Sequence, residues 1–174
     1  MPQEIVEDIT FKIDPAGQLI VPKHIVDSLN KYQQVNYNDT EAGGILLGRQ
    51  FENKLSITID EITTPFKSDK RSRNSFYRSK SHHNYAVKRW EESDGYCLYL
   101  GLWHTHPEAI PIPSSIDYVD WTKAINQGDF DGKNLFFIII GTEQVRCWQG
   151  ARRSFFKRGI RLKNNFKQLE VLYE

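Results

Sequence analysis

The feature that most restricts the fold of this 174-residue chain is a run of six consecutive apolar residues, 135–140. A helix that crosses a bilayer needs about 20 apolar residues, so this run is far too short to span a membrane. A strand that is apolar throughout must be covered on both faces, which is typical of sheets with helices on each side. The run therefore predicts a central strand of a layered α/β fold, with residues 144–148 returning beside it as a hairpin.

Short strands and amphipathic helices alternate along the rest of the chain. Residues 10–13 and 19–21 are predicted to form a hairpin, and apolar side chains recur at helical spacing over residues 22–33. Further strands are expected at residues 45–47, 55–59 and 96–106, and further helices at residues 82–93 and 114–126. The order β-β-α-β-β-α-β-α-β-β predicts an α/β fold in which a mixed β-sheet is flanked by helices.

Composition limits the environment and the partners of the protein. A hydrophobic content of 39% argues against disorder, and a formal net charge of +1 does not indicate a polyanionic partner. Cys97 and Cys147 lack the spacing of a disulfide framework or a thiolate zinc site. The N-terminus has no signal-peptide core. We therefore expect a cytoplasmic protein without membrane contact that forms one domain over residues 1–174.

Two histidines separated by one residue stand at the end of the predicted strand 96–106. Because strand side chains alternate between faces, His104 and His106 are expected on one side, and Trp103 and Thr105 on the other. Two imidazoles on one side of a strand can bind a single metal ion. A His-x-His pair by itself is more often structural, so a metal site needs further ligands nearby in the chain.

Seven residues, 107–113, separate His106 from the sequence Ser114-Ser115-Ile116-Asp117. A helix that starts at Ser114 places Asp117 in its first turn, where the carboxylate can return over the strand end as a third ligand. Two histidines and one carboxylate leave a fourth position for water, as in catalytic zinc sites. The Ser-x-x-Asp pattern is also typical of a helix N-cap. The two interpretations are compatible, because the Ser114 backbone can cap the helix while its hydroxyl group faces the site and hydrogen-bonds an oxyanion.

Hydrolysis of an amide also needs a group that moves protons, and the candidate is Glu41, just before a Gly-Gly pair. An isolated carboxylate at such a position would more often be a solvated loop residue. Glu108 is the local competitor and is expected at the rim of the site. A second histidine pair, His82 and His83, is not expected to share a metal, because adjacent residues diverge on a helix.

Two basic segments carry interspersed aromatic residues, at positions 67–80 and 152–167. Such mixtures can bind single-stranded nucleic acid. A solvated surface explains both segments more simply, so a nucleic-acid partner is not expected.

The complete pattern resembles the motif of the JAB/MPN zinc metallopeptidases, also called JAMM isopeptidases. That motif is an upstream glutamate, His-x-His, seven residues and Ser-x-x-Asp, and no position of this chain departs from it. The resemblance covers about residues 15–150 and leaves residues 151–174 as a C-terminal extension. It implies a cytidine-deaminase-like JAB/MPN fold.

The resemblance also implies a role for each residue of the motif. It implies a Zn²⁺ ion bound by His104, His106 and Asp117, with Glu41 as general acid and base and Ser114 as oxyanion stabiliser. The implied reaction is hydrolysis of the amide bond after the C-terminus of a ubiquitin-like protein.

Within this family the chain is similar to stand-alone bacterial deconjugating peptidases of CBASS antiphage operons. Such an enzyme releases the C-terminus of a nucleotidyltransferase from the protein to which it was attached, so a conjugated nucleotidyltransferase-like protein is a second possible substrate class. In the family an insertion at the position of residues 62–80 often grips the substrate tail, and its charge here suggests an acidic partner. The alternative is a non-catalytic MPN-type interaction module that binds a ubiquitin-like partner, although the intact motif argues against it.

Overall fold

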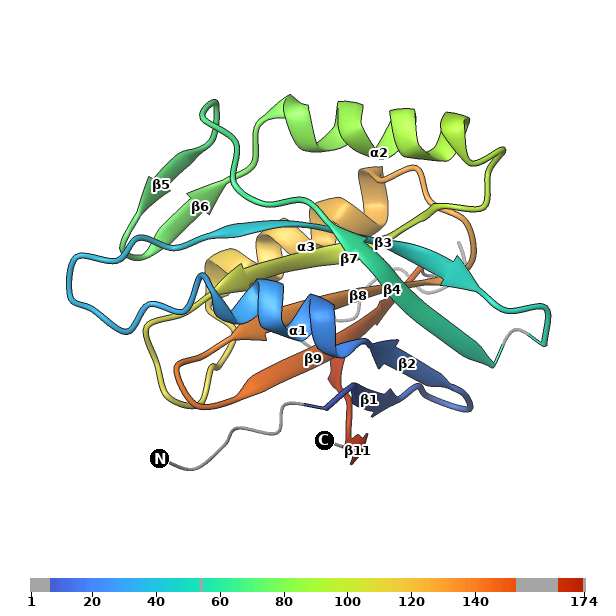
Figure 1. Cartoon of the computed structure of the whole chain (residues 1–174), viewed down its shortest axis with the longest axis horizontal. Helices are drawn as coiled ribbons and strands as arrows, with labels where there is room; N and C mark the ends of the chain where they lie inside the picture. Colours follow the sequence, from blue (N-terminus) through green and yellow to red (C-terminus); the bar gives the residue numbers. More distant parts are fainter. Residues whose placement is uncertain (1–6, 54, 153–165, 174) are drawn as a thin grey trace.

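The computed structural model describes residues 7–53, 55–152 and 166–173. Its main strands are β1 Ile9–Lys12, β2 Gln18–Val21, β3 Gly43–Gln50, β4 Ser56–Ile62, β7 Leu98–Thr105, β8 Asn134–Ile140, β9 Val145–Ala151, β10 Phe166–Gln168 and β11 Val171–Tyr173. Among the described residues they form one mixed sheet in the order β10-β9-β8-β7-β3-β4-β2-β1-β11. The helices are α1 Lys23–Asn30, α2 Lys80–Glu92 and α3 Ser115–Gln127 (Figure 1). The prediction of a mixed sheet flanked by helices is confirmed.

Strand β8 is central, as its composition predicts. It pairs in parallel with β7 and antiparallel with β9, so the predicted hairpin partner is also confirmed. All residues from 135 to 140 are buried. Alternate side chains enter different clusters: Phe136 and Ile138 pack in one, and Leu135 and Phe137 in the other.

The two clusters correspond to the two faces of the sheet. One contains Ile25, Val26 and Leu29 of α1. The other contains Trp121 and Ile125 of α3, and it also takes partly buried side chains from α2. Figure 1 shows α1 and α3 on opposite sides of the sheet, and the two cores therefore hold these helices in place around β7 and β8.

The sheet is curled, so that its two ends approach each other. The short chain from β10 to β11 bridges them: the Leu169 N–H donates to Cys147 O at 2.9 Å, and the Lys12 N–H donates to Glu170 O at 2.8 Å. The side chain of Gln149 adds two hydrogen bonds to the backbone of Asp14. These strands belong to the predicted C-terminal extension, whose apolar pattern was too short to predict them; the rest of the basic segment 152–167 lies mostly outside the described residues.

The basic segment at residues 67–80 contains a second, two-stranded sheet that the sequence did not predict. Strands β5 Lys70–Ser72 and β6 Ser75–Tyr77 pair as an antiparallel hairpin. Each strand has only three residues and none is fully buried, so the alternating apolar pattern that identifies a strand is absent.

A buried hydrogen-bonded network anchors this insertion to the main sheet. Thr63 Oγ1 accepts from the Ile45 N–H at 2.9 Å, so its own proton is directed to His82 Nδ1, 2.6 Å away. His82 Nε2 then donates to Asp69 Oδ2 at 2.8 Å. On the other side, Trp103 Nε1 donates to the carbonyl oxygen of Thr63 at 2.9 Å. The network thus connects the insertion and the start of α2 to β3 and β7.

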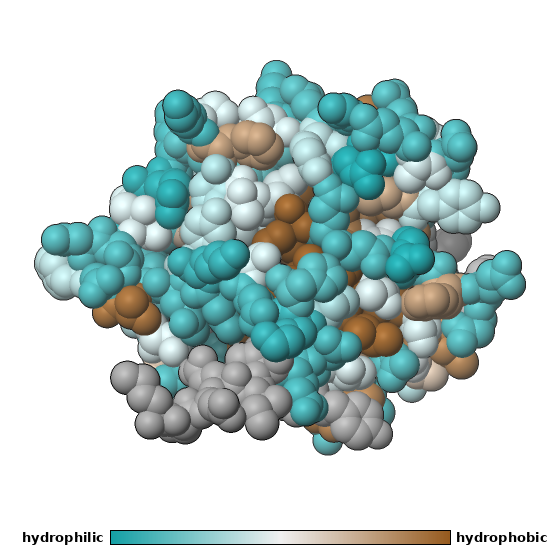
Figure 2. Space-filling view, viewed as in Figure 1, coloured by the Kyte–Doolittle hydropathy of each residue, from teal (hydrophilic) through white to brown (hydrophobic). Residues whose placement is uncertain are grey.

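Among the described residues, no helix is long and apolar enough to cross a membrane. The face of the molecule in Figure 2 is mainly hydrophilic, with apolar side chains exposed only in small separate patches.

Asp69 should contribute to stability through its negative charge. Burial opposes ionisation, but hydrogen bonds from the Ser79 N–H and from His82 lower the pKa of Asp69 to about 2. Because the folded-state pKa is depressed, the contribution is complete above the unfolded pKa near 4 and disappears as the pH falls toward 2. We expect Asp69→Asn to lower the free energy of unfolding at pH 7 by about 2 kcal/mol, measured by urea denaturation.

The difference between wild type and Asp69→Asn should shrink between pH 4 and pH 3. The exposed residue Glu143 provides a control, Glu143→Gln, that should unfold like the wild type. A difference that stays constant down to pH 3 would show that the charge of Asp69 does not stabilise the fold.

Candidate metal centre

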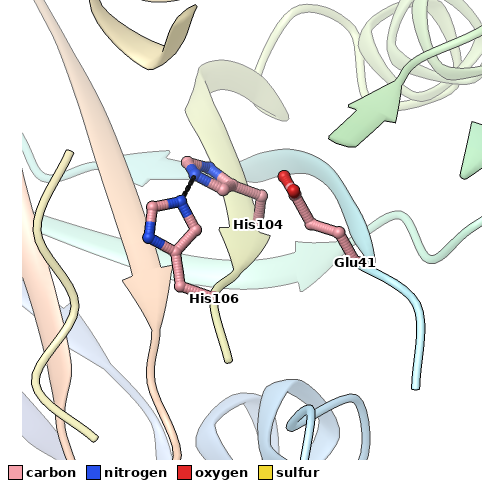
Figure 3. Close-up of side chains that lie close together, drawn as sticks. All are labelled: Glu41, His104 and His106. Carbon is pink, nitrogen blue, oxygen red and sulfur yellow. Dashed lines mark hydrogen bonds between the residues drawn. The ribbon is translucent and has the colours of Figure 1, made fainter. Parts of the chain in front are cut away.

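The two histidines of the motif lie at the end of β7 with their rings on the same side of the strand. His104 and His106 are buried, with 5% and 8% of their surface exposed, and their Nε2 atoms are 3.0 Å apart (Figure 3). Trp103 and Thr105, fully buried, belong to the opposite side of the strand. The alternation expected from the sequence is therefore present, and it brings two nitrogen donors to one point.

Asp117 reaches the histidines from the first turn of α3. Its Oδ1 atom is 3.1 Å from His104 Nε2, and its Oδ2 atom is 3.3 Å from His106 Nε2. The helix begins with a capping box: the Ser114 N–H donates to Asp117 Oδ2 at 2.6 Å, and the Asp117 N–H donates to Ser114 Oγ at 3.2 Å. The same carboxylate therefore caps the helix and faces both imidazoles.

Glu41 completes the cluster from the chain segment that leads into β3. It is 7% exposed, so the alternative of a solvated loop carboxylate is wrong. One ligand atom each from Glu41, His104 and His106 can be chosen so that all lie within 4.8 Å of one another. Gly43 permits this approach, because it is paired with His104 and a Cβ atom on it would lie 2.7 Å from Trp103 O on β7.

Ser114 lies at the rim of the same cleft, which has a volume of about 440 Å³. The sequence suggested that its backbone would cap α3 while its hydroxyl group faced the site. In the structure the hydroxyl oxygen is itself the cap acceptor, and its proton remains able to donate.

The other candidates lie outside the cluster. Glu108 is exposed, and its carboxylate is 3.8 Å from His106 Nδ1, a buried nitrogen that has no hydrogen-bond partner among the described residues. His82 belongs to the network with Asp69, and its neighbour His83 is exposed. Neither member of this second pair contributes to the cluster.

The surroundings set the charges of the four clustered side chains. Burial raises the pKa of Glu41 to about 8, although His106 opposes this, and burial lowers the pKa of His104. For His106 burial lowers the pKa, but the Asp117 carboxylate outweighs it and the net shift is upward. For Asp117 burial is outweighed by hydrogen bonds from both histidines, which hold its pKa well below the ordinary value.

These residues fit a zinc ion in their chemistry. Two imidazole nitrogens with carboxylate oxygens are a donor set that zinc takes in catalytic sites. Two buried carboxylates also favour a divalent cation, because its charge offsets theirs. The second nitrogen of His106 lies 3.8 Å from the Glu108 carboxylate, a kind of group to which metal-binding histidines commonly donate.

Three arginines of the basic segment 67–80 contact the chain itself. Arg71 Nε donates to Glu41 O at 2.8 Å, and Arg73 Nη1 donates to the carbonyl oxygens of residues 36 and 37. Arg78 forms an ion pair with Asp120 of α3. The positive charge of the segment is therefore used partly within the molecule, a role that the sequence did not suggest.

The geometry agrees with what comparison with known proteins finds. A family model described as prokaryotic homologues of the JAB domain matches residues 23–151. A relative from Escherichia coli named CD-NTase/cGAS isopeptidase is 32% identical over 164 residues, which is 94% of each chain. Relatives of the same name from Vibrio cholerae and Pseudomonas aeruginosa are 30% and 37% identical, over 83% and 68% of this chain and 88% and 74% of theirs.

Two solved structures are similar in fold. The solution structure of a Desulfitobacterium hafniense protein aligns with a TM-score of 0.54 at 18% identity, covering 85% of this chain and 87% of that one. A Salinibacter ruber protein gives 0.50 at 14% identity, covering 88% and 90%. At these identities the likeness supports the fold alone.

Two substitutions in the capping box should have different effects, one on stability and the other on zinc affinity. Ser114→Ala removes the acceptor of the Asp117 N–H, so we expect the free energy of unfolding to fall by about 1 kcal/mol while zinc binding is retained. Asp117→Asn removes the negative charge of a carboxylate whose two oxygens face the two histidines, so zinc affinity should fall by a factor of about 10 or more. Urea denaturation and competition with a chelating indicator measure the two effects. Equal zinc affinity in Asp117→Asn and wild type would exclude Asp117 as a ligand.

Proposed function

This chain belongs to the family of prokaryotic homologues of the JAB domain and is an isopeptidase, and on that premise we propose that it uses zinc at the end of β7. In this proposal His104, His106 and Asp117 hold the ion. Glu41 is the general acid and base, and Ser114 stabilises the oxyanion. The observation that carries the proposal is that four buried side chains from three separate segments meet at one point: Glu41, His104, His106 and Asp117.

Zinc would supply Lewis-acid chemistry: when bound, it would polarise the scissile carbonyl group and lower the pKa of water, so that water loses a proton and becomes a nucleophile near neutral pH. The chain's own residues would orient the reactants and carry the protons. Since the site lies at the end of a strand and at the start of a helix, its donors are held by rigid elements, which favours precise placement.

Glu41 is proposed to carry the proton from the attacking water to the leaving amine. Its pKa of about 8, raised by burial, lets the carboxyl group both accept and release a proton near neutral pH. A bound cation would lower this pKa and increase the fraction that can act as a base.

Ser114 is proposed to stabilise the negative charge that develops on the substrate oxygen. Its hydroxyl oxygen is occupied by the Asp117 N–H, so the remaining proton of the hydroxyl group can be donated outward into the cleft. A donor fixed in this way costs little reorganisation during the reaction.

The names of the relatives support a narrower proposal for the substrate. A CD-NTase joined through its C-terminus to an amine of another protein would be cleaved at that bond, and this would regulate CBASS antiphage defence in the bacterial cytoplasm. A ubiquitin-like protein joined in the same way is the other substrate class. In both cases residues 1–174 would act as one domain on a protein, without a membrane or a nucleic-acid partner.

Glu41→Gln tests the proton-transfer step, because glutamine keeps the shape of the side chain but cannot accept a proton. We expect zinc content to be unchanged and kcat to fall by a factor of about 10² to 10⁴. Zinc is measured by mass spectrometry, and turnover on a conjugate with an isopeptide bond. The exposed variant Glu143→Gln should behave like the wild type. Wild-type turnover by Glu41→Gln would exclude it as the base.

The substrate is tested with two matched conjugates. One carries the C-terminus of the CD-NTase encoded by the same genome on a lysine Nζ, and the other carries ubiquitin. We expect the zinc-loaded enzyme to release the CD-NTase with a kcat/KM at least about tenfold higher than that for ubiquitin. A preference for ubiquitin would contradict the CD-NTase assignment without contradicting isopeptide hydrolysis.

A further inference from the structure

Gln34 is a buried glutamine in the connection between α1 and β3, with 2% of its surface exposed. Its Oε1 atom accepts a hydrogen bond from Thr105 Oγ1 at 2.8 Å. Its Nε2 atom donates to the carbonyl oxygens of Arg73 at 2.8 Å and Asp39 at 3.3 Å. Because the amide is used at both ends, its orientation is fixed, and it joins β7 to the turn of the β5–β6 hairpin.

Thr105 connects Gln34 to the segment that carries Glu41. The Thr105 N–H donates to Ala42 O at 2.9 Å, and the Ala42 N–H donates to Thr105 Oγ1 at 3.0 Å. Since the hydroxyl oxygen accepts from Ala42, its proton is directed to Gln34. The result is a directed chain of hydrogen bonds from Ala42 through Thr105 to Gln34. Ala42 is the residue after Glu41, and Thr105 lies between the two histidines of the cluster.

The β5–β6 hairpin holds Glu41 from the other direction. Strand β3 begins at Gly43, so the backbone of Glu41 lies outside that strand. The Glu41 N–H donates to Ser72 O at 2.8 Å, and Arg71 Nε donates to Glu41 O at 2.8 Å. Glu41 is thus fixed between the hairpin and β7, and Gln34 is bonded to both.

We infer that Gln34 is a positioning residue: through Thr105 and the hairpin it fixes Glu41 against His104 and His106. The inference rests on the proposed function, because it assumes that Glu41 moves a proton in hydrolysis. Loss of the Gln34 amide removes the acceptor of the buried Thr105 hydroxyl proton and the donor to the carbonyl oxygens of Arg73 and Asp39. The segment around Glu41 then relaxes, while the ligands on β7 and α3 keep their own support.

The test is Gln34→Met, which preserves the length of the side chain and removes its hydrogen bonds. In the zinc-loaded enzyme we expect kcat to fall by a factor of about 10 or more, because displacement of a catalytic group by about 1 Å has effects of this size. KM should stay within about twofold and zinc content should not change. Gln33→Met is the matched control, since Gln33 also donates two hydrogen bonds, to Gly141 O and Thr142 O. Its kcat should equal that of the wild type.

Substitutions at Thr105 test the same chain of bonds without changing Gln34. Thr105→Val, which has the same shape but no hydroxyl group, should lower kcat as Gln34→Met does. Thr105→Ser keeps the hydroxyl group and should have a kcat close to that of the wild type. The double variant of Gln34→Met and Thr105→Val should be no slower than the slower single variant, because both break one chain.

Several results would overturn the inference. A kcat for Gln34→Met equal to that of Gln33→Met would exclude a positioning role, and so would loss of zinc rather than of turnover. If the kcat of Thr105→Ser is as low as that of Thr105→Val, the hydroxyl group does not connect Gln34 to Glu41. If instead the zinc-loaded wild type does not hydrolyse the conjugates, or if Glu41→Gln keeps full turnover, the proposed function fails first.

Discussion

The pairing of the chain before β3 with the end of β7 is the constraint on which the candidate site depends. Two hydrogen bonds place Glu41 beside the histidines: the Thr105 N–H donates to Ala42 O, and the Ala42 N–H donates to the Thr105 hydroxyl oxygen. This approach to β7 requires glycine at position 43, because a Cβ atom on Gly43 would lie 2.7 Å from Trp103 O. A Cβ atom on Gly44 would lie 2.1 Å from Thr63 O, which follows β4. A side chain at position 43 would therefore separate this segment from β7 and move the Glu41 carboxylate away from the imidazoles.

The start of α3 places the Asp117 carboxylate. The capping box fixes Asp117 twice: its carboxylate accepts from the Ser114 N–H, and its own N–H donates to Ser114 Oγ. The two oxygens of the same carboxylate face His104 and His106. Trp121, one turn further along α3, packs beneath His104 with ring centroids 6.4 Å apart. The helix is therefore fixed by the core and by its cap, so the donors are preorganised by the fold.

The insertion between β4 and α2 has a structural role as well as an exposed surface. The network of Thr63, His82 and Asp69 fastens it to the sheet, and Arg71 and Ser72 fasten it to Glu41. Much of its positive charge is directed toward backbone carbonyl oxygens and toward Asp120. A role in gripping an acidic substrate would therefore depend on the cationic side chains that remain directed outward.

Local patterns in the sequence determine the elements that a short window can specify. The continuous apolar run predicts the central strand β8, strand alternation predicts the common side of His104 and His106, and Ser114-x-x-Asp117 predicts both the cap and the returning carboxylate. Hairpin β5–β6 and edge strands β10 and β11 are too short and too exposed to produce such a pattern. Other features depend on hydrogen bonds between residues 30 to 71 positions apart in the chain. They are the burial of Glu41, its contacts with the hairpin and the role of Gln34. Only the tertiary structure decides them, because hydrogen bonds between distant segments exist only once the sheet has brought those segments together.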